Sequence, residues 1–470
     1  MMSKPRILLL VANPKRDLPG IVLLAHELCQ RGATCLIALY KHRRTEAWAL
    51  APDFVLLPVF RPFQQEQAGQ FLDAGVQFGL LDTEGVVWTS LDEYRQTLWK
   101  DDAIRHAARC VCMWGSMVSE YSVRQGLFTS DQMRVTGCPR FDFYSPELGA
   151  VYQDLITPLA QEKRPVVLLN TNFTVRNDEL SKMVKTYGYS PEQLDRACAN
   201  EHKAIEEVAK LATRLSTDFK QLLIAIRPHP EEDEATYLAR IPKHDNLVVS
   251  KASYIASWIL RSVAVIQRSC TTAIEACMSG KLAIAPQWYA PSNYYPLPES
   301  VSLPCASYEE IARRLTARLE GNDQLPEALS ETIRNVIHDG FYRIDGQAHS
   351  RVADLILERL LPGVKPKTQR CIDYLYGTQA PGVSFTRSAG ARIRQTLKLH
   401  PEWSFRSFGA PGQKGTDPDF NSQDVTDLLS AIGQVKRVGK ASLLRVRSAV
   451  DAEEYLVPSF RGGALRVGKE

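Results

Sequence analysis

The sequence lacks the cysteine patterns of metal-binding and disulfide-linked proteins. Its ten cysteines are scattered, none forms a CxxC pair, and no group of residues has the spacing of metal ligands. The two closest, Cys110 and Cys112, alternate within the apolar run CVCMW, as buried thiols in a strand do. We therefore expect no zinc site, no disulfide framework and no metal among the functional residues.

Long apolar runs are absent as well. The run ILLLVA near the start is far too short for the core of a signal peptide or for a membrane span, and no later run approaches that span without a charge. The sequence also lacks an internal repeat and the recurring aromatic signatures of RNA-binding domains. These absences predict a cytoplasmic protein that does not bind nucleic acid.

What is present is the composition of a soluble globular protein, with 44% hydrophobic and 23% charged residues. A chain of 470 residues predicts two or three domains. The net charge of +4 is uneven, because the segment from Leu361 to the end carries 17 Lys and Arg against 10 Asp and Glu. This basic tail is either a solvated surface or a peripheral contact with the cytoplasmic face of the inner membrane.

Strand-like and helix-like segments alternate through most of the chain. RILLLVA followed by GIVLLAHELCQRGATCLIALY indicates strand, loop, helix and strand, and RPVVLLNTNFT begins a second such series. We therefore predict an α/β protein with doubly wound Rossmann-like domains at 1–150 and 151–361 and a partly irregular basic extension at 362–470. Because no GxGxxG follows the first strand, the pair suggests the GT-B architecture of glycosyltransferases, with the domains facing a cleft, or an epimerase of the same shape.

Ligands of open α/β sheets bind beyond the carboxyl ends of the strands, so the strand-to-helix junctions are the places to search. The first junction of the second domain, NTNFT, places Asn170, Thr171, Asn172 and Thr174 directly after an apolar strand. Turn and helix-cap roles explain one or two of these residues. Four within five positions also fit the polar wall of a pocket.

The second junction is RPHPEED, in which His229 stands between two prolines after the run LLIAI. Proline removes a backbone donor and restricts the residue before it, so the strand stops abruptly with one imidazole at its end. Such an imidazole can stabilise charge on a leaving phosphate. The alternative is a surface histidine, with Arg227 paired to the acids that follow.

The third junction is QRSCTTAIEACMSG, with Ser269, Thr271 and Thr272 at the expected start of a helix and Glu275 one turn later. The N–H groups at a helix start and the helix dipole favour a phosphate, and the hydroxyls add donors. A simple capping box is the alternative, but it needs only one hydroxyl.

The first domain offers one comparable junction, LLDTEGVVW. Asp82 and Glu84 follow an apolar strand and precede Gly85, which allows a tight turn. Two neighbouring carboxylates raise the pKa of one of them, as a general base requires. The alternative is an ordinary acidic turn.

Taken together, these junctions resemble a family. The ordered set DTEG, VTGCPRFD, NTNF, RPHP and SCTTAIEA is similar to motifs of bacterial surface-carbohydrate biosynthesis proteins, GT-B glycosyltransferases related to Kdo transferases and bacterial sialyltransferases. The resemblance covers about residues 5–360. The chain departs from the pattern where Thr83 separates the two acids, which leaves open which carboxylate acts.

The resemblance implies a glycosyltransferase that needs no cofactor beyond its co-substrate, a CMP-activated 2-keto sugar acid such as Kdo. It implies that His229 holds the phosphate of the leaving CMP, that Glu275 binds the ribose, and that Glu84 or Asp82 serves the acceptor hydroxyl or the sugar centre. The acceptor would be a glycan or a lipid-linked glycan. The donor-binding set, completed with the neighbouring Arg227, is Asn170, Thr171, Asn172, Arg227, Ser269, Thr271, Thr272 and Glu275.

Three other functions stay open from the sequence. A CDP-glycerol or CDP-ribitol phosphotransferase has the same shape, an HP-like histidine and a Ser-rich donor helix. A UDP-GlcNAc 2-epimerase has the shape but no acceptor. A binding subunit that kept the fold without the chemistry is the fourth interpretation.

Overall fold

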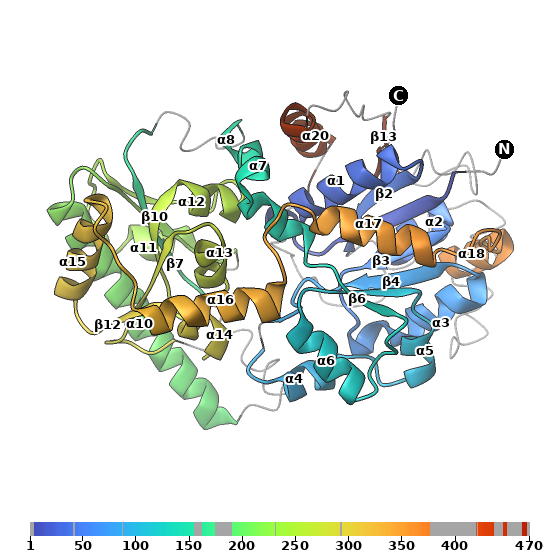
Figure 1. Cartoon of the computed structure of the whole chain (residues 1–470), viewed down its shortest axis with the longest axis horizontal. Coiled ribbons are helices and arrows are strands. Elements are labelled where there is room, and N and C mark those ends of the chain that lie inside the picture. The colour runs from blue at the N-terminus through green and yellow to red at the C-terminus, as the bar shows by residue number, and fades with distance from the viewer. Residues whose placement is uncertain are drawn as a thin grey trace. The chain divides into compact units, whose positions relative to one another are not determined.

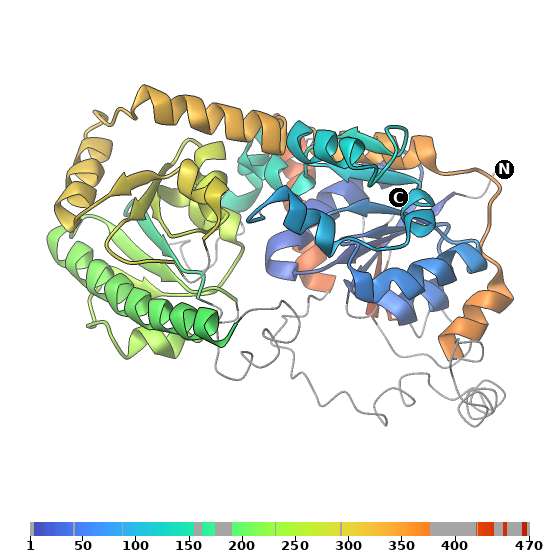
Figure 2. The same ribbon diagram turned by 90° about the horizontal axis from the view of Figure 1, so that it is seen from below.

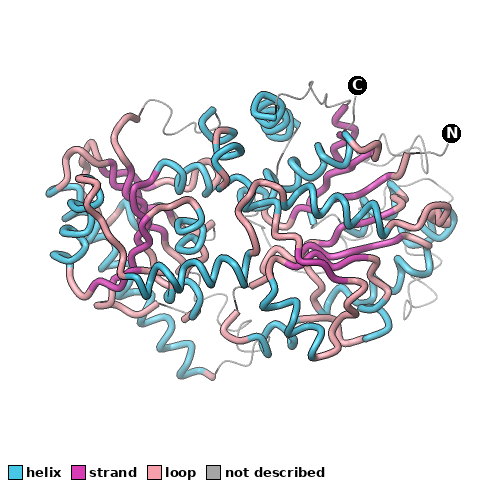
Figure 3. The backbone as a smooth tube through the Cα atoms, in the orientation of Figure 1, coloured by secondary structure: helices cyan, strands magenta, loops and turns pink. Residues whose placement is uncertain are grey.

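The computed structural model describes residues 4–40, 43–86, 88–154, 162–173, 190–230, 232–291, 294–376, 420, 422–436, 445–448 and 463–467. The chain forms two units, each built around its own β-sheet (Figure 1). Unit 1 comprises residues 1–86, 90–143 and 341–470, and unit 2 comprises residues 87–89 and 144–340. The strands of each sheet are enclosed by helices, as the tube in Figure 3 shows.

Unit 1 is built on a sheet in the order β13-β14-β2-β1-β3-β4-β5-β6, in which the six strands from β2 to β6 run parallel. Its strands are β1 (Arg6–Val11), β2 (Thr34–Leu39), β3 (Phe54–Leu57), β4 (Gln77–Leu81), β5 (Cys110–Met113), β6 (Met133–Val135), β13 (Arg445–Ser448) and β14 (Gly463–Val467). Its helices are α1 (Pro14–Gln30), α2 (Arg43–Leu50), η2 (Pro62–Gln64), α3 (Gln65–Ala74), α4 (Leu91–Thr97), α5 (Asp102–His106), α6 (Ser116–Arg124), η3 (Pro139–Tyr144), α17 (Ala348–Arg359), α18 (Thr368–Tyr376) and α20 (Ser422–Lys436).

The first strand–helix–strand unit forms where the sequence predicts it. β1 is buried along nearly its whole length, as a strand covered on both faces must be. Pro14 opens α1, where its missing N–H costs nothing, and Gly32 follows the helix with a φ of 94°. That left-handed conformation favours glycine and turns the chain into β2.

The C-terminal segment contributes to unit 1 rather than standing apart. Strand β14 pairs antiparallel with β2, and β13 pairs antiparallel with β14, so two late strands extend the parallel sheet at its edge. Helix α20 packs on α1, and α18 packs on α2 and α3 (Figure 1). The segment 362–470, expected to be partly irregular, therefore contains two edge strands and two helices. Residues 377–419 and most of 437–470 lie outside the described residues.

Helix α17 also differs from expectation. The stretch SRVADLILERLL, residues 350–361, predicts an amphipathic helix that completes the second domain. The helix forms over Ala348–Arg359 and packs on α1 and β5 of unit 1. Figure 1 shows α17 beside α1, in agreement with this packing. The units accordingly divide after Phe143 and after Gly340 rather than at 150 and 361. An apolar stripe requires a partner but does not say which sheet supplies it.

Unit 2 is built on a six-stranded parallel sheet in the order β12-β11-β10-β7-β8-β9. Its strands are β7 (Val166–Asn170), β8 (Leu223–Arg227), β9 (Leu247–Val249), β10 (Ser262–Ile266), β11 (Leu282–Pro286) and β12 (Leu303–Cys305). Its helices are α7 (Pro146–Gly149), α8 (Val151–Asp154), α10 (Pro191–Asp218), α11 (Glu234–Leu238), α12 (Ile255–Arg261), α13 (Thr272–Met278), α14 (Pro296–Ser300), α15 (Tyr308–Leu319) and α16 (Glu327–Phe341).

The core of unit 2 lies on both faces of this sheet. One face is covered by α10, α11 and α15, whose side chains form a cluster with alternate strand residues such as Leu169, Ile226 and Ile266. The long helix α10, green in Figure 2, runs along β8 and β9. The other face carries α12 and α13. No helix among the described residues is both long and apolar enough to cross a membrane.

Each sheet has a point where the chain reverses its direction of travel across the strands. In unit 1 the reversal falls between β1 and β3, and in unit 2 it falls between β7 and β10. Loops that leave such neighbouring strands in opposite directions open a crevice at the carboxyl edge of the sheet. The predicted polar junctions of the second domain flank its reversal point.

Candidate functional site

The reversal point of the second sheet brings two of the predicted junctions into contact. Strands β7 and β10 are adjacent and parallel, so the segments that follow them leave from the same edge. The side-chain amide of Asn170 lies 3.3 Å from the sulfur of Cys270, and the amide of Asn172 donates to the carbonyl of Ser269 at 3.4 Å. Residues about one hundred positions apart in the sequence thus form one polar wall.

The remaining junction, RPHPEED, is joined to the same wall by Glu232. Its carboxylate accepts hydrogen bonds from the Thr171 hydroxyl at 2.7 Å and from the His229 backbone N–H at 3.0 Å. It also accepts from the backbone N–H of Phe173 at 3.0 Å and from the Tyr237 hydroxyl at 2.6 Å. Glu232 therefore ties the end of β7 to the loop after β8 and holds the backbone of His229, whose side chain is half-buried.

Sequence reasoning missed Glu232, which is one of three consecutive acids after the HP pair. Burial raises the pKa of its carboxyl, and the four hydrogen bonds oppose that change without reversing it. Arg227, expected as a donor ligand or as a partner of these acids, instead donates to the carbonyls of Ala252 and Ser253. Burial lowers the pKa of Arg227 to about 10.

The raised pKa predicts how Glu232→Gln changes stability with pH. The folded protein binds this proton more tightly than the unfolded chain, whose carboxyl has the usual pKa of about 4.5. The contribution of Glu232 is therefore present below that pH and is lost as the pH rises through the folded-state pKa. We expect the difference in unfolding free energy, wild type minus Glu232→Gln, to fall from pH ~4 to pH ~8 in denaturant titrations.

A matched control is the substitution of Glu331, which is exposed on α16. Glu331→Gln removes one carboxyl from the surface and therefore controls for the loss of a single charge. If the difference in unfolding free energy between wild type and Glu232→Gln rises with pH, the pKa of Glu232 is not raised in the folded protein.

Ser269 has a structural setting that the sequence did not indicate. Its φ is 50°, a conformation that costs about 1–3 kcal/mol in a residue with a Cβ and that persists only where surrounding bonds impose it. Glu299 supplies those bonds, since it accepts from the Ser269 N–H at 2.6 Å and from its hydroxyl at 3.1 Å. The hydroxyl also accepts from the Tyr295 N–H at 3.2 Å. Ser269 is 1% exposed, so its side chain faces the interior of unit 2 and stabilises the loop there.

Thr271, Thr272 and Glu275 lie at the start of α13, directly after the loop that contains Ser269. Thr271 is the N-cap residue, but its side chain makes no capping hydrogen bond, so the alternative of a simple capping box is not formed. Glu275 is buried and accepts from the hydroxyl of Tyr144. Thr271 is half-buried and Thr272 is buried. The loop therefore presents Thr271 at the edge of the sheet, next to the wall formed by Asn170 and Asn172.

The acidic pair of unit 1 divides into a buried and an accessible carboxylate. Asp82 is 4% exposed, lies 3.3 Å from Arg61, and accepts from the Glu84 backbone N–H at 2.9 Å. Burial raises the pKa of Asp82, and Arg61 opposes that shift. The Glu84 side chain is 53% exposed and lies 3.5 Å from Arg61 and 3.9 Å from Arg16. Asp82 thus fixes the turn, whereas Glu84 can meet a ligand.

Gly85 is required for a different reason from the tight turn that the sequence suggests. A Cβ at this position would lie 2.8 Å from Cδ2 and 3.0 Å from Cε2 of Trp114, so the glycine allows the turn to pack against the indole. We expect Gly85→Ala to lower the unfolding free energy by about 1–3 kcal/mol through overpacking. Gly69→Ala is the control, because its Cβ would have only Ile104 Cδ1 at 3.8 Å and should stabilise α3 slightly. Equal melting temperatures for the two variants would refute this explanation.

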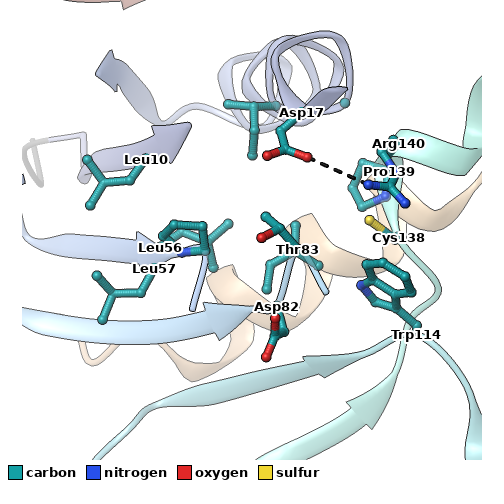
Figure 4. Close-up of a pocket in the computed structure, with 14 residues that line it drawn as sticks. Leu10, Asp17, Leu56, Leu57, Asp82, Thr83, Trp114, Cys138, Pro139 and Arg140 are labelled. Atoms are coloured by element: carbon teal, nitrogen blue, oxygen red, sulfur yellow. Dashed lines mark ion pairs between the residues drawn. The ribbon is translucent and has the colours of Figure 1, made fainter. Parts of the chain in front are cut away.

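A pocket that is open to solvent lies at the reversal point of the first sheet (Figure 4), and its space, the solvent at its mouth included, is about 390 Å³. It is lined by residues from the ends of β1, β3 and β4, from the start of α1, and from the segment after β6. Asp17 and Arg140 face one another across it, with 3.8 Å between the closest carboxylate oxygen and guanidinium nitrogen. Trp114, another residue that the sequence did not single out, forms one wall.

Searches of known proteins give structural matches alone. No family model and no curated protein matches the sequence. The wall teichoic acid polymerase TagF matches with a TM-score of 0.50 at 10% identity, over 76% of this chain and 90% of that one. The putative UDP-N-acetylglucosamine 2-epimerase from Listeria monocytogenes matches with a TM-score of 0.48 at 12% identity, over 76% of this chain and 96% of that one.

Another such epimerase, from Neisseria meningitidis and bound to UDP-GlcNAc, matches with a TM-score of 0.46 at 13% identity, over 75% of this chain and 99% of that one. The chain has the GT-B fold, with two doubly wound Rossmann-like units, as the sequence predicts. Within the described residues, no three His, Cys, Asp or Glu side chains are grouped as a metal ion would need.

Proposed function

We propose that this protein is a glycosyltransferase of bacterial surface-carbohydrate synthesis that binds a nucleotide-activated sugar in unit 2. The observation that carries the proposal is the meeting of three polar strand ends at the carboxyl edge of the second sheet. Asn172 contacts the loop after β10, and Glu232 joins Thr171 to the backbone of His229. Open α/β sheets bind nucleotides at this position.

The chemistry of this edge suits a leaving nucleotide with one phosphate. When CMP departs, about one extra negative charge develops on its phosphate. An imidazole at His229, the hydroxyls of Thr271 and Thr272, and oriented N–H groups can stabilise that charge. The polar side chains of Asn170 and Asn172 are candidates to bind the rest of the donor. The motif resemblance implies that this donor is a CMP-activated 2-keto sugar acid.

The sugar acceptor needs a base for its hydroxyl, and unit 1 supplies the candidates. Glu84 is the carboxylate with an accessible side chain, and the buried Asp82 orients it by accepting its backbone N–H. We assign the role of general base to Glu84, and Asp82 is the residue that positions it. The acceptor is proposed to be a glycan or a lipid-linked glycan, and contact of the basic tail with the inner membrane remains a prediction for residues that are largely undescribed.

A second candidate is transfer of a phosphopolyol from a CDP-linked donor. It is favoured by the similarity to TagF, one structure of which was solved after a soak with CDPG and matches with a TM-score of 0.50. A CDP donor also releases CMP, so the same edge of the second sheet could serve either reaction.

The test is incubation of the full chain with CMP-Kdo, CDP-glycerol or UDP-GlcNAc, each with and without a glycan acceptor. Acceptor-dependent release of CMP from CMP-Kdo supports the proposal, and release from CDP-glycerol supports the second candidate. Conversion of UDP-GlcNAc to UDP-ManNAc without acceptor would replace both with an epimerase. If the protein turns over none of the three donors, both the proposed function and the second candidate are contradicted.

A further inference from the structure

The pocket of unit 1 contains a buried hydrogen-bond donor that has no partner in the part of the chain that the structure describes. The indole Nε1–H of Trp114 makes no hydrogen bond among the described residues, although the side chain is only 3% exposed. Leaving such a donor unpaired destabilises the folded state. Trp114 lines the pocket, and Figure 4 shows its nitrogen on the edge of the ring turned toward Thr83 and Asp82.

The indole is held firmly in this orientation. Gly85 packs against one side, where even a Cβ would lie within 2.8 Å of the ring. The guanidinium of Arg140 lies 5.2 Å from the ring centroid, and Phe141 meets the ring edge-on at 5.0 Å between centroids. Because the ring cannot turn away, its N–H stays fixed at the pocket wall.

The other polar groups of the pocket include acceptors as well as donors. Thr83 lines the pocket with a hydroxyl, which can donate and accept. The Asp17 carboxylate is 6% exposed; it accepts from Arg16 Nε at 2.7 Å and from the Asn13 N–H at 3.0 Å, and it faces Arg140. Charges of both signs therefore already balance inside the pocket, which does not favour a strongly anionic ligand.

The remaining wall is apolar. Leu10, Leu56 and Leu57 contribute from the ends of β1 and β3, and Pro139 and Cys138 contribute from the segment after β6. A pocket with apolar walls and a few fixed donors and acceptors recognises a ligand that combines a C–H surface with hydroxyl groups. A sugar ring without charge has both.

We propose that the pocket at the reversal point of the first sheet binds an uncharged, hydroxylated ring, with the Trp114 N–H donating to one of its oxygens. Asp17 and Thr83 accept from its hydroxyl groups, and the leucines pack against its C–H face. The site itself is inferred from unit 1 alone. Only its identification as the seat of the acceptor's sugar rests on the proposed function.

The test is a ligand-observed NMR titration of the full chain with methyl glycosides of glucose, galactose and N-acetylglucosamine, and with inorganic phosphate. We expect at least one glycoside to bind and Trp114→Phe to weaken that binding by about three- to tenfold, the value of one net hydrogen bond. Thr83→Val, which keeps the shape and removes the hydroxyl, should weaken it similarly.

Trp99→Phe is the matched control. Trp99 is also a buried tryptophan of unit 1 whose Nε1 has no partner among the described residues, but it stacks on Phe60 and does not line the pocket. It should lose stability like Trp114→Phe and bind the glycoside like the wild type. If Trp114→Phe does not fold, Thr83→Val decides the question.

The outcomes separate this site from the proposed donor site. Absence of glycoside binding, preference for phosphate, or equal binding by wild type, Trp114→Phe and Thr83→Val would overturn the inference. Nucleotide binding measured on the same samples reports on unit 2 and should be the same in all three variants. Failure of nucleotide binding with intact glycoside binding would count against the proposed function and leave this inference standing.

Discussion

Replacement of His229 by alanine should lower turnover by ~10²–10³-fold and leave the fold intact, since that is the usual effect of removing one donor to a charge that develops in the reaction. Glu232 accepts from the His229 backbone N–H, and this hydrogen bond is kept when the imidazole is removed. The side chain is half-buried, which limits the cavity left behind. The loss should therefore fall on kcat with little change in melting temperature.

The matched control is His202→Ala on α10 of the same unit. His202 is exposed, and its Nδ1 lies 2.8 Å from the Cys198 carbonyl of its own helix. This variant should retain wild-type kcat. Near-normal turnover of His229→Ala would remove that histidine from the reaction.

Replacement of Glu84 by glutamine should lower turnover by ~10²–10⁴-fold, the range of general acid–base catalysis, without an increase in KM for the donor. Glutamine keeps the length and hydrogen-bonding capacity of the side chain but cannot take a proton. Because the Glu84 side chain is half exposed and meets Arg61 only at 3.5 Å, its charge contributes little to stability. Steady-state kinetics with saturating donor, alongside thermal melting, provides the measurement.

Asp82→Asn should affect stability more than turnover, the reverse of Glu84→Gln. Asp82 is buried, pairs with Arg61 and holds the Glu84 N–H, so its neutralisation should lower the melting temperature and reduce turnover less than Glu84→Gln does. If Asp82→Asn abolished turnover at unchanged stability, the roles of the two acids would have to be exchanged.

The alternation of strands and helices was predictable because parallel strands are covered on both faces. Segments such as 166–170, 223–227 and 262–266 are therefore short, nearly continuous apolar runs between polar junctions. The partners of the late elements were not predictable. Helix α17 and strand β14 both joined unit 1, a choice set by contacts with α1, β5 and β2 rather than by their own sequences.

The candidate site was predictable to the same extent. The polar residues that follow β7, β8 and β10 are visible as junctions, and their meeting follows from the order of the strands. The buried carboxylates that organise them are not visible, because Glu232 is one acid among three and Glu299 is thirty residues from Ser269. The left-handed backbone of Ser269 and an indole N–H without a partner among the described residues leave no pattern in the sequence either.

The central claim, that the carboxyl edge of the second sheet binds a cytidine nucleotide, is tested most directly by thermal melting of the full chain with CMP, CDP, UDP and GDP. A ligand at one hundred times its Kd stabilises the folded state by about 2.7 kcal/mol. We predict that CMP or CDP raises the melting temperature and that Asn172→Ala and Thr271→Ala reduce the shift. No shift with either cytidine nucleotide, or a shift that both variants retain in full, would contradict the claim.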